Sequence, residues 1–394
     1  MEHIYLDYGS TAFPKAPGVG QAMADYIDQV GVNIGRGGYE AAYHTAEVVL
    51  DTRERLCRLF GWNRPESVIF TSGVTASLNI LLKGFLRSGD RVAATSMEHN
   101  AVLRPLAQLA QSGVEVEIIS CERDGSLPPE RLEEALRRRP RALVMTHASN
   151  VCGTLLPAEE AAALCRRYGV RMILDCAQTG GVFPVDMLGW GVDALAFAGH
   201  KGLLGPQGIG GFLITGEMAM EVTPLLAGGT GSQSHLETMP DFLPDRFEAG
   251  TLNLPGIFGL RAALDYVERQ GIHTLRQRSI ARTDQLLRGL ARIRDIRVVG
   301  RPGTEGRGAV VSVDFLHLDN AQAAYELENR WGIETRCGLH CAPKAHQTLG
   351  TYPQGTVRFT PGHATTEEEI DRAVSAIEEI AKERGPLSSD LRKF

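Results

Sequence analysis

Short apolar segments alternate with helical segments from residue 67 onward. The segments that predict strands cover residues 67–71, 91–95, 114–119, 142–146, 171–175, 194–198 and 211–215. Helices are predicted between many of them, at residues 73–86, 101–111, 129–138 and 158–168. Strands that alternate with helices form crossover units, so we expect an α/β fold with a mostly parallel seven-stranded sheet flanked by helices. Such a sheet binds ligands beyond the carboxyl ends of its strands.

The pattern changes near residue 256. Longer helices are predicted at residues 255–270, 273–294, 320–331 and 366–383, and short strands at 297–299, 309–314 and 356–360. This mixture predicts a smaller α+β C-terminal domain. We therefore expect a large domain of residues 16–255 and a small domain of residues 1–15 and 256–394. Two more helices are predicted at 18–30 and 43–59, and the tail after residue 385 is expected to be frayed.

Composition excludes several classes of protein. The 394 residues are 43% hydrophobic and 22% charged, which is typical of a globular protein with a large core. The net charge of −6 gives no reason to expect nucleic acid or an anionic membrane as partner. We find no apolar run long enough for a bilayer and no signal-peptide pattern near Met1. The seven cysteines lack paired metal spacings, so we expect reduced thiols, a cytoplasmic location and no metal site.

A lysine and a possible anion site follow two of the predicted strands. Lys201 comes directly after strand 194–198, in the turn Gly199-His200-Lys201. Desolvation lowers the pKa of an amine, and a neutral amine can form Schiff bases with carbonyl cofactors. A surface loop lysine is the alternative. The backbone N–H groups around Val74, with the Thr75 hydroxyl, could bind a phosphate at a helix start, and a simple helix cap is the alternative there.

Four further polar residues follow strands of the same sheet. Asp175 ends strand 171–175, and a buried carboxylate needs a cationic partner such as a protonated pyridine nitrogen. A loop-capping or arginine-paired Asp is the alternative. His99 could stack on a ring or transfer a proton, unless it is a hydrogen-bonded core histidine. Asn150 supplies an amide at the same edge, and Gln178 could hydrogen-bond a ring hydroxyl.

These strand-end residues together resemble class V of the fold-type I enzymes that use pyridoxal 5′-phosphate (PLP). The resemblance covers essentially the whole chain, and its specific matches are Ala198-Gly199-His200-Lys201 and Leu174-Asp175-Cys176-Ala177-Gln178. It implies that Lys201 binds PLP covalently and that His99 stacks on the cofactor ring. It also implies that Asp175 pairs with the ring nitrogen and that Gln178 contacts O3′.

The resemblance further implies a homodimer. In such enzymes a segment like Glu248-Ala249-Gly250-Thr251 reaches the neighbouring subunit, so Gly250 and Thr251 would complete the partner's phosphate site. The chain departs from the family at Ala198, where relatives often have Ser, and Val74 also lacks a hydroxyl. We therefore expect phosphate binding to depend on Thr75, His200 and Thr251.

A second group of functional residues lies in the predicted small domain. Arg336 and Arg358 are candidates to bind a substrate carboxylate, and surface ion pairs are their alternative role. Cys341 follows His340, and positive neighbours favour the nucleophilic thiolate of a cysteine. An inert core thiol is the alternative. A zinc half-site made with Cys337 would lack a second cysteine pair.

The pattern Arg-x-Gly-x-His-Cys-Ala at residues 336–342 resembles the active-site loop of group II cysteine desulfurases. The resemblance implies that L-cysteine is converted to L-alanine and that sulfur passes to Cys341 as a persulfide, then to a protein acceptor. Arg336, Arg358 and Asn150 would bind the substrate. Lys201 would remove the Cα proton, and His99 would carry protons in the thiol steps.

Two positions of this loop differ from the family pattern, and other activities stay open. Cys337 stands where relatives often have Thr, and Leu339 replaces a common His. Cys337 either shields the persulfide or is a packing substitution. The closest alternative activity is that of a selenocysteine lyase. A class V aminotransferase or another lyase would leave Cys341 unused, and a non-enzymatic sulfur or metal carrier would need no cofactor.

Overall fold

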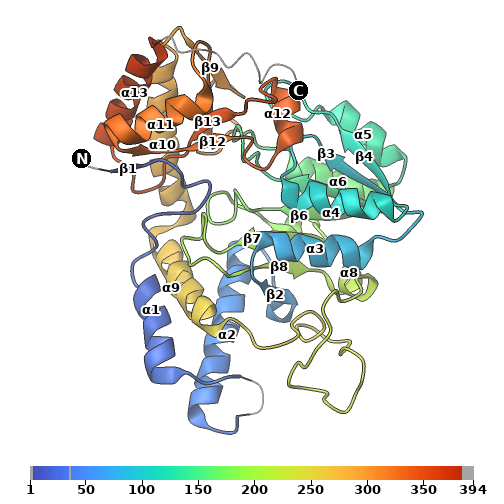
Figure 1. Ribbon diagram of the computed structural model, residues 1–394. Coiled ribbons are helices and arrows are strands. Elements are labelled where there is room, and N and C mark those ends of the chain that lie inside the picture. The colour runs from blue at the N-terminus through green and yellow to red at the C-terminus, as the bar shows by residue number, and fades with distance from the viewer. Residues whose placement is uncertain (1–2, 35–36, 384–394) are drawn as a thin grey trace.

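The computed structural model describes residues 3–34 and 37–383 (Figure 1). The tail predicted to be frayed lies outside these residues. The main sheet has seven strands in the order β2-β8-β7-β6-β5-β3-β4, which confirms the predicted sheet. Its strands are β2 (Val68–Thr71), β3 (Arg91–Thr95), β4 (Glu115–Ile119), β5 (Ala142–Thr146), β6 (Arg171–Asp175), β7 (Ala194–Ala198) and β8 (Gly210–Ile214).

The direction of the strands decides which loops meet. Strands β3 to β7 pair in parallel, whereas β8 is antiparallel to both β7 and β2. Strand β8 returns from β7 through a loop without a helix, and such a connection reverses the chain. Strand β2 therefore runs in the same direction as β7. The carboxyl ends of β2, β3, β5, β6 and β7 consequently lie at one edge of the sheet.

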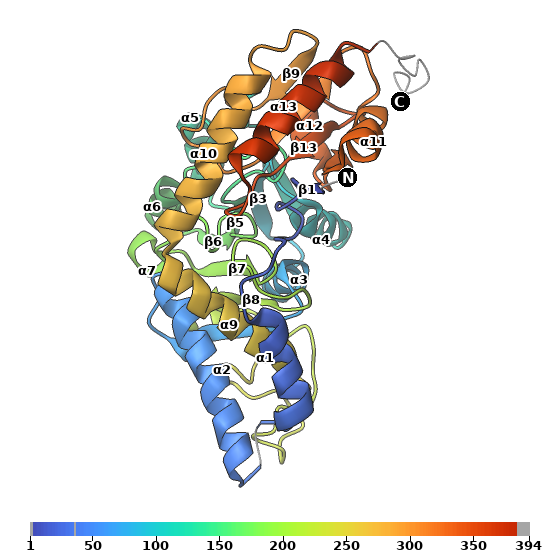
Figure 2. The ribbon, with the colours of Figure 1, turned by 90° about the vertical axis from the view of Figure 1, so that its left-hand side faces the viewer.

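Helices cover both faces of this sheet, as Figures 1 and 2 show. One face packs against α2 (Glu40–Leu59), α5 (Pro129–Arg137), α6 (Ala158–Tyr168), α7 (Met187–Trp190) and α9 (Leu254–Gln270). The other face packs against α3 (Val74–Phe85), α4 (Asn100–Gln111) and α8 (Gly216–Glu221). Helix α1 (Val19–Asp25) continues into a π-helical turn, Tyr26–Val30, and a short 3-10 helix, Pro65–Ser67, precedes β2.

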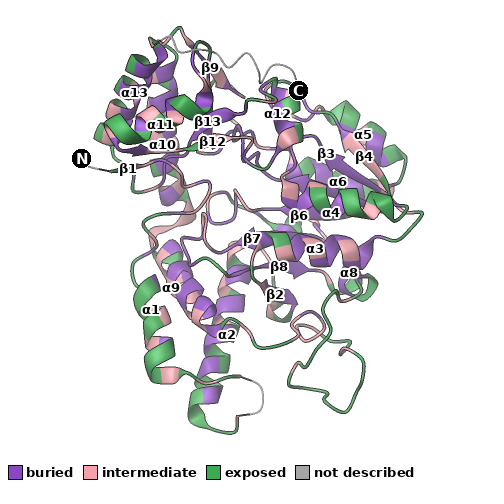
Figure 3. Cartoon of the chain, viewed as in Figure 1, coloured by how far each residue is buried: buried purple, intermediate pink, exposed green. Residues whose placement is uncertain are grey.

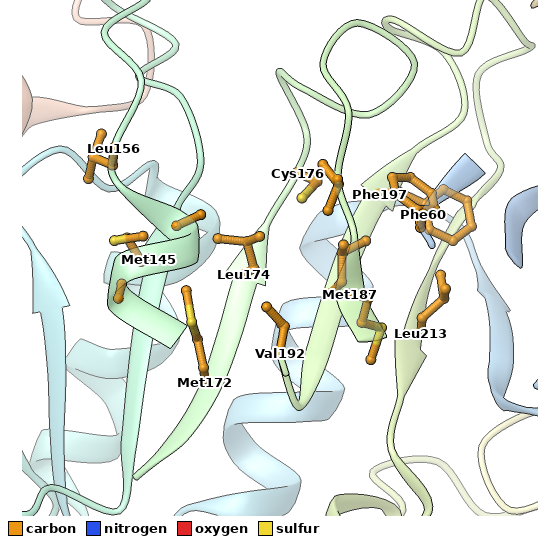
Figure 4. Close-up of a cluster of buried hydrophobic side chains, with 14 of the residues drawn as sticks. Phe60, Met145, Leu156, Met172, Leu174, Cys176, Met187, Val192, Phe197 and Leu213 are labelled. Atoms are coloured by element: carbon orange, nitrogen blue, oxygen red, sulfur yellow. The ribbon is translucent and has the colours of Figure 1, made fainter. Parts of the chain in front are cut away.

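The side chains of the central strand β7 alternate between the two faces of the sheet and contribute to both cores. Leu195 and Phe197 pack in the core beneath α2 and α9, where the Phe197 ring lies 5.7 Å from that of Phe60 (Figure 4). Ala194, Ala196 and Ala198 point to the opposite face, in the core shared with α3. Side chains alternate between the faces of a strand, so Ala198 belongs to the face on which α3 begins.

A second, antiparallel sheet lies in the C-terminal part, with strand order β12-β13-β10-β9. Its strands are β9 (Ile296–Val299), β10 (Val311–Phe315), β12 (Arg336–Gly338) and β13 (Thr356–Phe359). The helices of this part are α10 (Ile272–Leu290), α11 (Asn320–Trp331), α12 (Pro343–Leu349) and α13 (Glu367–Ala381). Apolar residues of this sheet and of α10, α11 and α13 form a core separate from the two cores of the main sheet.

The N-terminal segment joins the two parts of the molecule. Strand β1 (Ile4–Tyr5) pairs in parallel with β11 (Ile333–Glu334), and Asp7 forms a bridge with Thr360. The segment then passes to the main sheet, where the backbone N–H of Ala12 donates to the carbonyl of His200 at 2.9 Å. Figure 2 shows this blue segment running from β1 to α1. It therefore passes directly beside the lysine that follows β7.

The long connection 222–253 between α8 and α9 is largely exposed (Figure 3). It forms neither helix nor strand, and several large apolar side chains face solvent, namely Leu225, Leu226, Leu236 and Phe242. Among the described residues, no helix has the length and apolarity needed to cross a membrane.

Candidate active site

A cavity of about 330 Å³ lies where the carboxyl ends of the main strands face the C-terminal sheet. It collects ten of the residues expected to form the site, namely Val74, Thr75, His99, Asn150, Asp175, Gln178, His200, Lys201, Arg336 and Arg358. His340 also lines it, and the next residue, Cys341, is exposed. Gly250 and Thr251 are exposed and lie outside the lining of this cavity.

Lys201 lies in a tight turn after β7. A Cβ at Gly199 would stand 2.7 Å from the carbonyl oxygen of Ile209, so the turn requires glycine there. Burial lowers the pKa of the Lys201 amine to about 8, and the nearby Asp175 partly opposes this shift. A substantial fraction of the amine is therefore neutral near pH 8, the form that attacks a carbonyl carbon.

Asp175 is a buried carboxylate at the end of β6. Its Oδ1 accepts a hydrogen bond of 2.8 Å from the backbone N–H of Ala177. Burial raises the pKa of Asp175, and the N–H of Ala177 and the charge of Lys201 act against that rise. No cation of the described residues forms an ion pair with this carboxylate. A cationic ring nitrogen would supply the missing partner.

His99 caps the N-terminus of α4. Its Nδ1 accepts a 3.0 Å hydrogen bond from the backbone N–H of Ala101, so the neutral ring carries its proton on Nε2. Burial lowers the pKa of His99 to about 4, and the positive charges of Lys201 and Arg336 add to this effect. The imidazole is consequently neutral at neutral pH. It can donate from Nε2, but Nδ1 is engaged in the helix cap.

An anion site lies at the start of α3. Gly73 has a φ of 149°, a conformation that favours glycine, and the first N–H groups of the helix follow at Val74 and Thr75. The Nδ1 atom of His200 is buried and has no hydrogen-bond partner among the described residues. Buried polar atoms are usually paired, so this atom indicates a missing ligand. Together with Lys201 and Asp175, these groups fit PLP.

Arg336 and Arg358 lie directly opposite each other on the antiparallel strands β12 and β13. Arg358 is 2% exposed, and its Nη2 atom binds Asp7 Oδ1 at 2.8 Å and Ser10 Oγ at 2.7 Å. Its Nε atom is buried without a hydrogen-bond partner. Arg336 is exposed, and its Nη1 atom donates to the same Ser10 oxygen at 2.8 Å. Two guanidinium groups thus converge on one side of the cavity.

The loop between β12 and α12 carries Cys341. His340 and Cys341 have φ angles of 48° and 56°, and each left-handed non-glycine residue costs about 1–2 kcal/mol. The large part of the molecule holds this loop at two carbonyl groups. Asn150 Nδ2 donates to the His340 carbonyl at 2.7 Å, and the backbone N–H of Asn100 donates to the Cys341 carbonyl at 2.7 Å. The loop therefore has a defined position beside the cavity.

Cys337 occupies the other face of β12. Arg336 lines the cavity, whereas its neighbour Cys337 packs against the C-terminal core. Burial raises the pKa of the Cys337 thiol to about 11. The structure thus favours the packing interpretation of Cys337 over a role as a partner for the persulfide.

The sequence matches a family model, and this observation decides the family. The model for "Aminotransferase class-V" matches residues 4–373. The chain belongs to the class V aminotransferase family. Its sheet edge, its buried Asp175 and its Lys201 turn are therefore those of a class V protein.

The relatives of this class V protein include several cysteine desulfurases. It is 32% identical to a "Probable cysteine desulfurase" of Methanothermobacter thermautotrophicus over 96% of this chain and 95% of that one. The apo structure of the cysteine desulfurase of Thermococcus onnurineus NA1 has a TM-score of 0.89, 28% identity and coverage of 96% and 95%. The Escherichia coli cysteine desulfurase CsdA, solved as an S-sulfonic acid form, has a TM-score of 0.85, 26% identity and coverage of 96% and 94%.

Sequence reasoning missed part of this class V site. Asp7, Gly9 and Ser10 line or support the cavity, although residues 1–15 were expected only to belong to the small domain. The polar run after β1 is a weak signal that could have indicated them.

Within the described residues there is no cluster of three or more His, Cys, Asp or Glu side chains that could hold a metal ion.

Proposed function

We propose that this class V protein is a PLP-dependent cysteine desulfurase that converts L-cysteine to L-alanine and transfers the sulfur to Cys341 as a persulfide. The observation that carries this proposal is the position of the Cys341 loop. Asn150 and the N-terminus of α4 hold it beside a cavity that contains an amine of lowered pKa. A class V enzyme without thiol chemistry has no need of an exposed cysteine held there.

The residues around Lys201 are proposed to bind and assist PLP, which supplies an electron sink for the carbanion at the substrate Cα when bound. Lys201 would hold the cofactor covalently, and its amine, whose pKa is lowered by burial, would take the proton from the substrate Cα. Asp175 would keep the ring nitrogen protonated. Gln178, whose Nε2 donates to the Gly9 carbonyl at 3.1 Å, would contact the ring hydroxyl O3′.

The phosphate is proposed to lie at the start of α3. The N–H groups at Val74 and Thr75, the Thr75 hydroxyl and the unpaired His200 Nδ1 are its partners. Ala198 contributes no hydroxyl, because its side chain, on the face of the sheet that packs against α3, is a methyl group. The phosphate site therefore depends on helix N–H groups, His200 and the neighbouring subunit's Thr251.

Arg336, Arg358 and Asn150 are proposed to bind the substrate. Asp7 offsets the charge of Arg358, whereas Arg336 forms no ion pair with the residues that the structure describes, which suits the single carboxylate of L-cysteine. The Cys341 thiolate attacks the substrate sulfur, the carbon–sulfur bond breaks and its electron pair stays on carbon. His99 would stack on the cofactor ring. Its Nδ1 accepts from the backbone N–H of Ala101, so it would act in the thiol steps as a proton donor from Nε2.

Homodimer formation and a protein sulfur acceptor are parts of the same proposal. Glu248 is tied to its own subunit by Arg53 at 2.7 Å, whereas Gly250 and Thr251 beyond it are exposed and can reach a neighbour. The exposed apolar side chains of the 222–253 connection support burial against a second copy. We further propose a cytoplasmic location, a large domain of residues 16–255 and a small domain of residues 1–15 and 256–394.

The proposal is tested by the amount of alanine released from L-cysteine. Cys341→Ser should abolish turnover, while the matched variant Cys337→Ser should retain it, because Cys337 packs away from the cavity. Unchanged turnover in Cys341→Ser would refute the persulfide mechanism and favour another class V lyase or an aminotransferase. The same assay with L-selenocysteine tests the alternative of a selenocysteine lyase. For such a lyase, Cys341→Ser should still release alanine from L-selenocysteine but not from L-cysteine.

A further inference from the structure

Ser10 is placed between the two arginines that face the cavity. Its hydroxyl accepts hydrogen bonds from Arg358 Nη2 at 2.7 Å and from Arg336 Nη1 at 2.8 Å. It donates to Asp7 Oδ1 at 2.8 Å. We propose that Ser10 is a positioning residue that sets the recognition of the substrate carboxylate, an inference that rests on the proposed function.

The hydrogen-bonding capacity of this hydroxyl is fully used. A serine hydroxyl has one donor and two acceptor sites, and all three are occupied by Asp7, Arg336 and Arg358. Rotation of the hydroxyl would therefore break at least one of these bonds. The two guanidinium groups are consequently held at a fixed separation by a single oxygen atom.

Ser10 matters more for Arg336 than for Arg358. Arg358 is buried and keeps two other partners, the Asp7 carboxylate and the Asn150 carbonyl at 3.0 Å. Arg336 is exposed, and Ser10 is its hydrogen-bond partner among the described residues. Long exposed side chains lose rotamer freedom when they are ordered. Ser10 removes that freedom before the substrate arrives, which reduces the entropic cost of binding.

The N-terminal segment that carries Ser10 is itself fixed at several points. The backbone N–H of Gly9 donates to Thr360 Oγ1 at 2.8 Å, and the Gly9 carbonyl accepts from Gln178. A Cβ at Gly9 would lie 3.3 Å from the Arg358 guanidinium carbon, so the backbone passes close to that arginine. Ser10 is therefore held by contacts to both parts of the molecule.

The proposal predicts a loss that is specific for ligands with a carboxylate. In the PLP-loaded protein, Ser10→Ala should raise the dissociation constant of L-alanine, followed by cofactor absorbance, about tenfold. The dissociation constant of ethylamine, which is L-alanine without its carboxylate, should stay unchanged. In turnover, the KM for L-cysteine should rise while kcat changes little. Ser10→Thr, which keeps the hydroxyl, should restore L-alanine binding.

Two outcomes would overturn this inference. One is unchanged L-alanine affinity in Ser10→Ala. The other is an equal loss for L-alanine and ethylamine, which would indicate a general structural role. L-Alanine binding is measured without turnover, so a wild-type protein that fails to release alanine from L-cysteine would refute the proposed function separately.

Discussion

At the scale of single residues, burial changes the reactivity of the Lys201 amine. Burial lowers its pKa to about 8, and such a lysine gains nucleophilic character near neutral pH. We predict that PLP adds to the cofactor-free protein faster as the pH rises from about 7 to 9, because the neutral fraction of the amine grows over that range. Stopped-flow absorbance measures the rate.

A matched control separates Lys201 from a second lysine nearby. Burial also lowers the pKa of Lys15 to about 8, and its amine donates to the His200 carbonyl at 3.2 Å. Borohydride reduction followed by peptide mapping should locate the cofactor on Lys201. Label on Lys15, or a rate that does not depend on pH, would contradict this account.

Glu98 is a second residue whose protonation is set by burial. Its Oε1 accepts from the Thr95 hydroxyl at 2.5 Å and from the Thr146 N–H at 3.0 Å, and its Oε2 has no partner in the described part of the chain. Burial raises the pKa of Glu98 to about 8, and the Asp175 charge adds to the rise. The native state thus keeps a proton that the unfolded state loses.

The sign of the resulting pH dependence follows from that proton. Between the unfolded pKa of about 4.3 and the native pKa of about 8, the native state binds more protons, so the Glu98 contribution to stability falls as the pH rises. Glu98→Gln cannot ionise and should flatten this part of the pH–stability curve. Urea unfolding at pH 5 to 8 tests this, and an identical slope in both proteins would show that Glu98 is not protonated.

At the scale of elements, the sequence indicated the main sheet well and the small elements poorly. Strands at 91–95, 142–146, 171–175 and 194–198 match β3, β5, β6 and β7, because buried parallel strands are continuous apolar runs. Helix 273–294 was predicted too long, since α10 ends at Leu290. Helices α7, α8 and α12 and strands β11 and β12 were missed, because they are too short to show a period.

The candidate site was predictable for the same physical reason. Asp175 ends a strand, Lys201 and His99 each follow one, and parallel strands bring their carboxyl ends together. Ser10 could not be predicted in this way, because its contacts to Arg336 and Arg358 join positions more than 300 residues apart in the sequence. The hydrogen bond that engages His99 Nδ1 likewise depends on backbone geometry at the start of α4.

A buried ion pair anchors the connection that carries Gly250 and Thr251. Arg53 on α2 binds Glu248 at 2.7 Å, and Glu248 also accepts from the Phe70 N–H of β2 at 2.7 Å. Both side chains are less than one tenth exposed. Glu248→Ala should destabilise the protein by about 3–5 kcal/mol, because it leaves the Arg53 charge buried without an opposite charge.

The double variant Arg53→Met/Glu248→Leu provides the control for this prediction. It removes both charges and keeps apolar volume, so its unfolding free energy should lie closer to that of the wild type. Chemical denaturation measures all three proteins. A double variant less stable than Glu248→Ala would show that the ion pair itself, and not the unpaired charge, determines stability.

At the scale of the whole molecule, the account requires two copies of the chain to build one complete phosphate site. Thr251 is exposed and lies outside the cavity of its own chain. Thr251→Ala should nevertheless weaken PLP binding several-fold, since one hydroxyl donor to an anion is lost. PLP titration of the cofactor-free variant measures this, with light scattering of the wild type and the variant to measure whether each is a dimer. Unchanged PLP affinity in a dimeric variant would contradict the shared site.

The central claim, that this molecule uses Cys341 to take sulfur from L-cysteine, is tested most directly by mass spectrometry. The PLP-loaded protein is incubated with L-cysteine, the free thiols are blocked, and the peptides are mapped. We predict one additional sulfur atom on Cys341 and none on the partly buried Cys337, together with release of L-alanine. A sulfur adduct confined to Cys337, or alanine release with Cys341 unmodified throughout turnover, would contradict it.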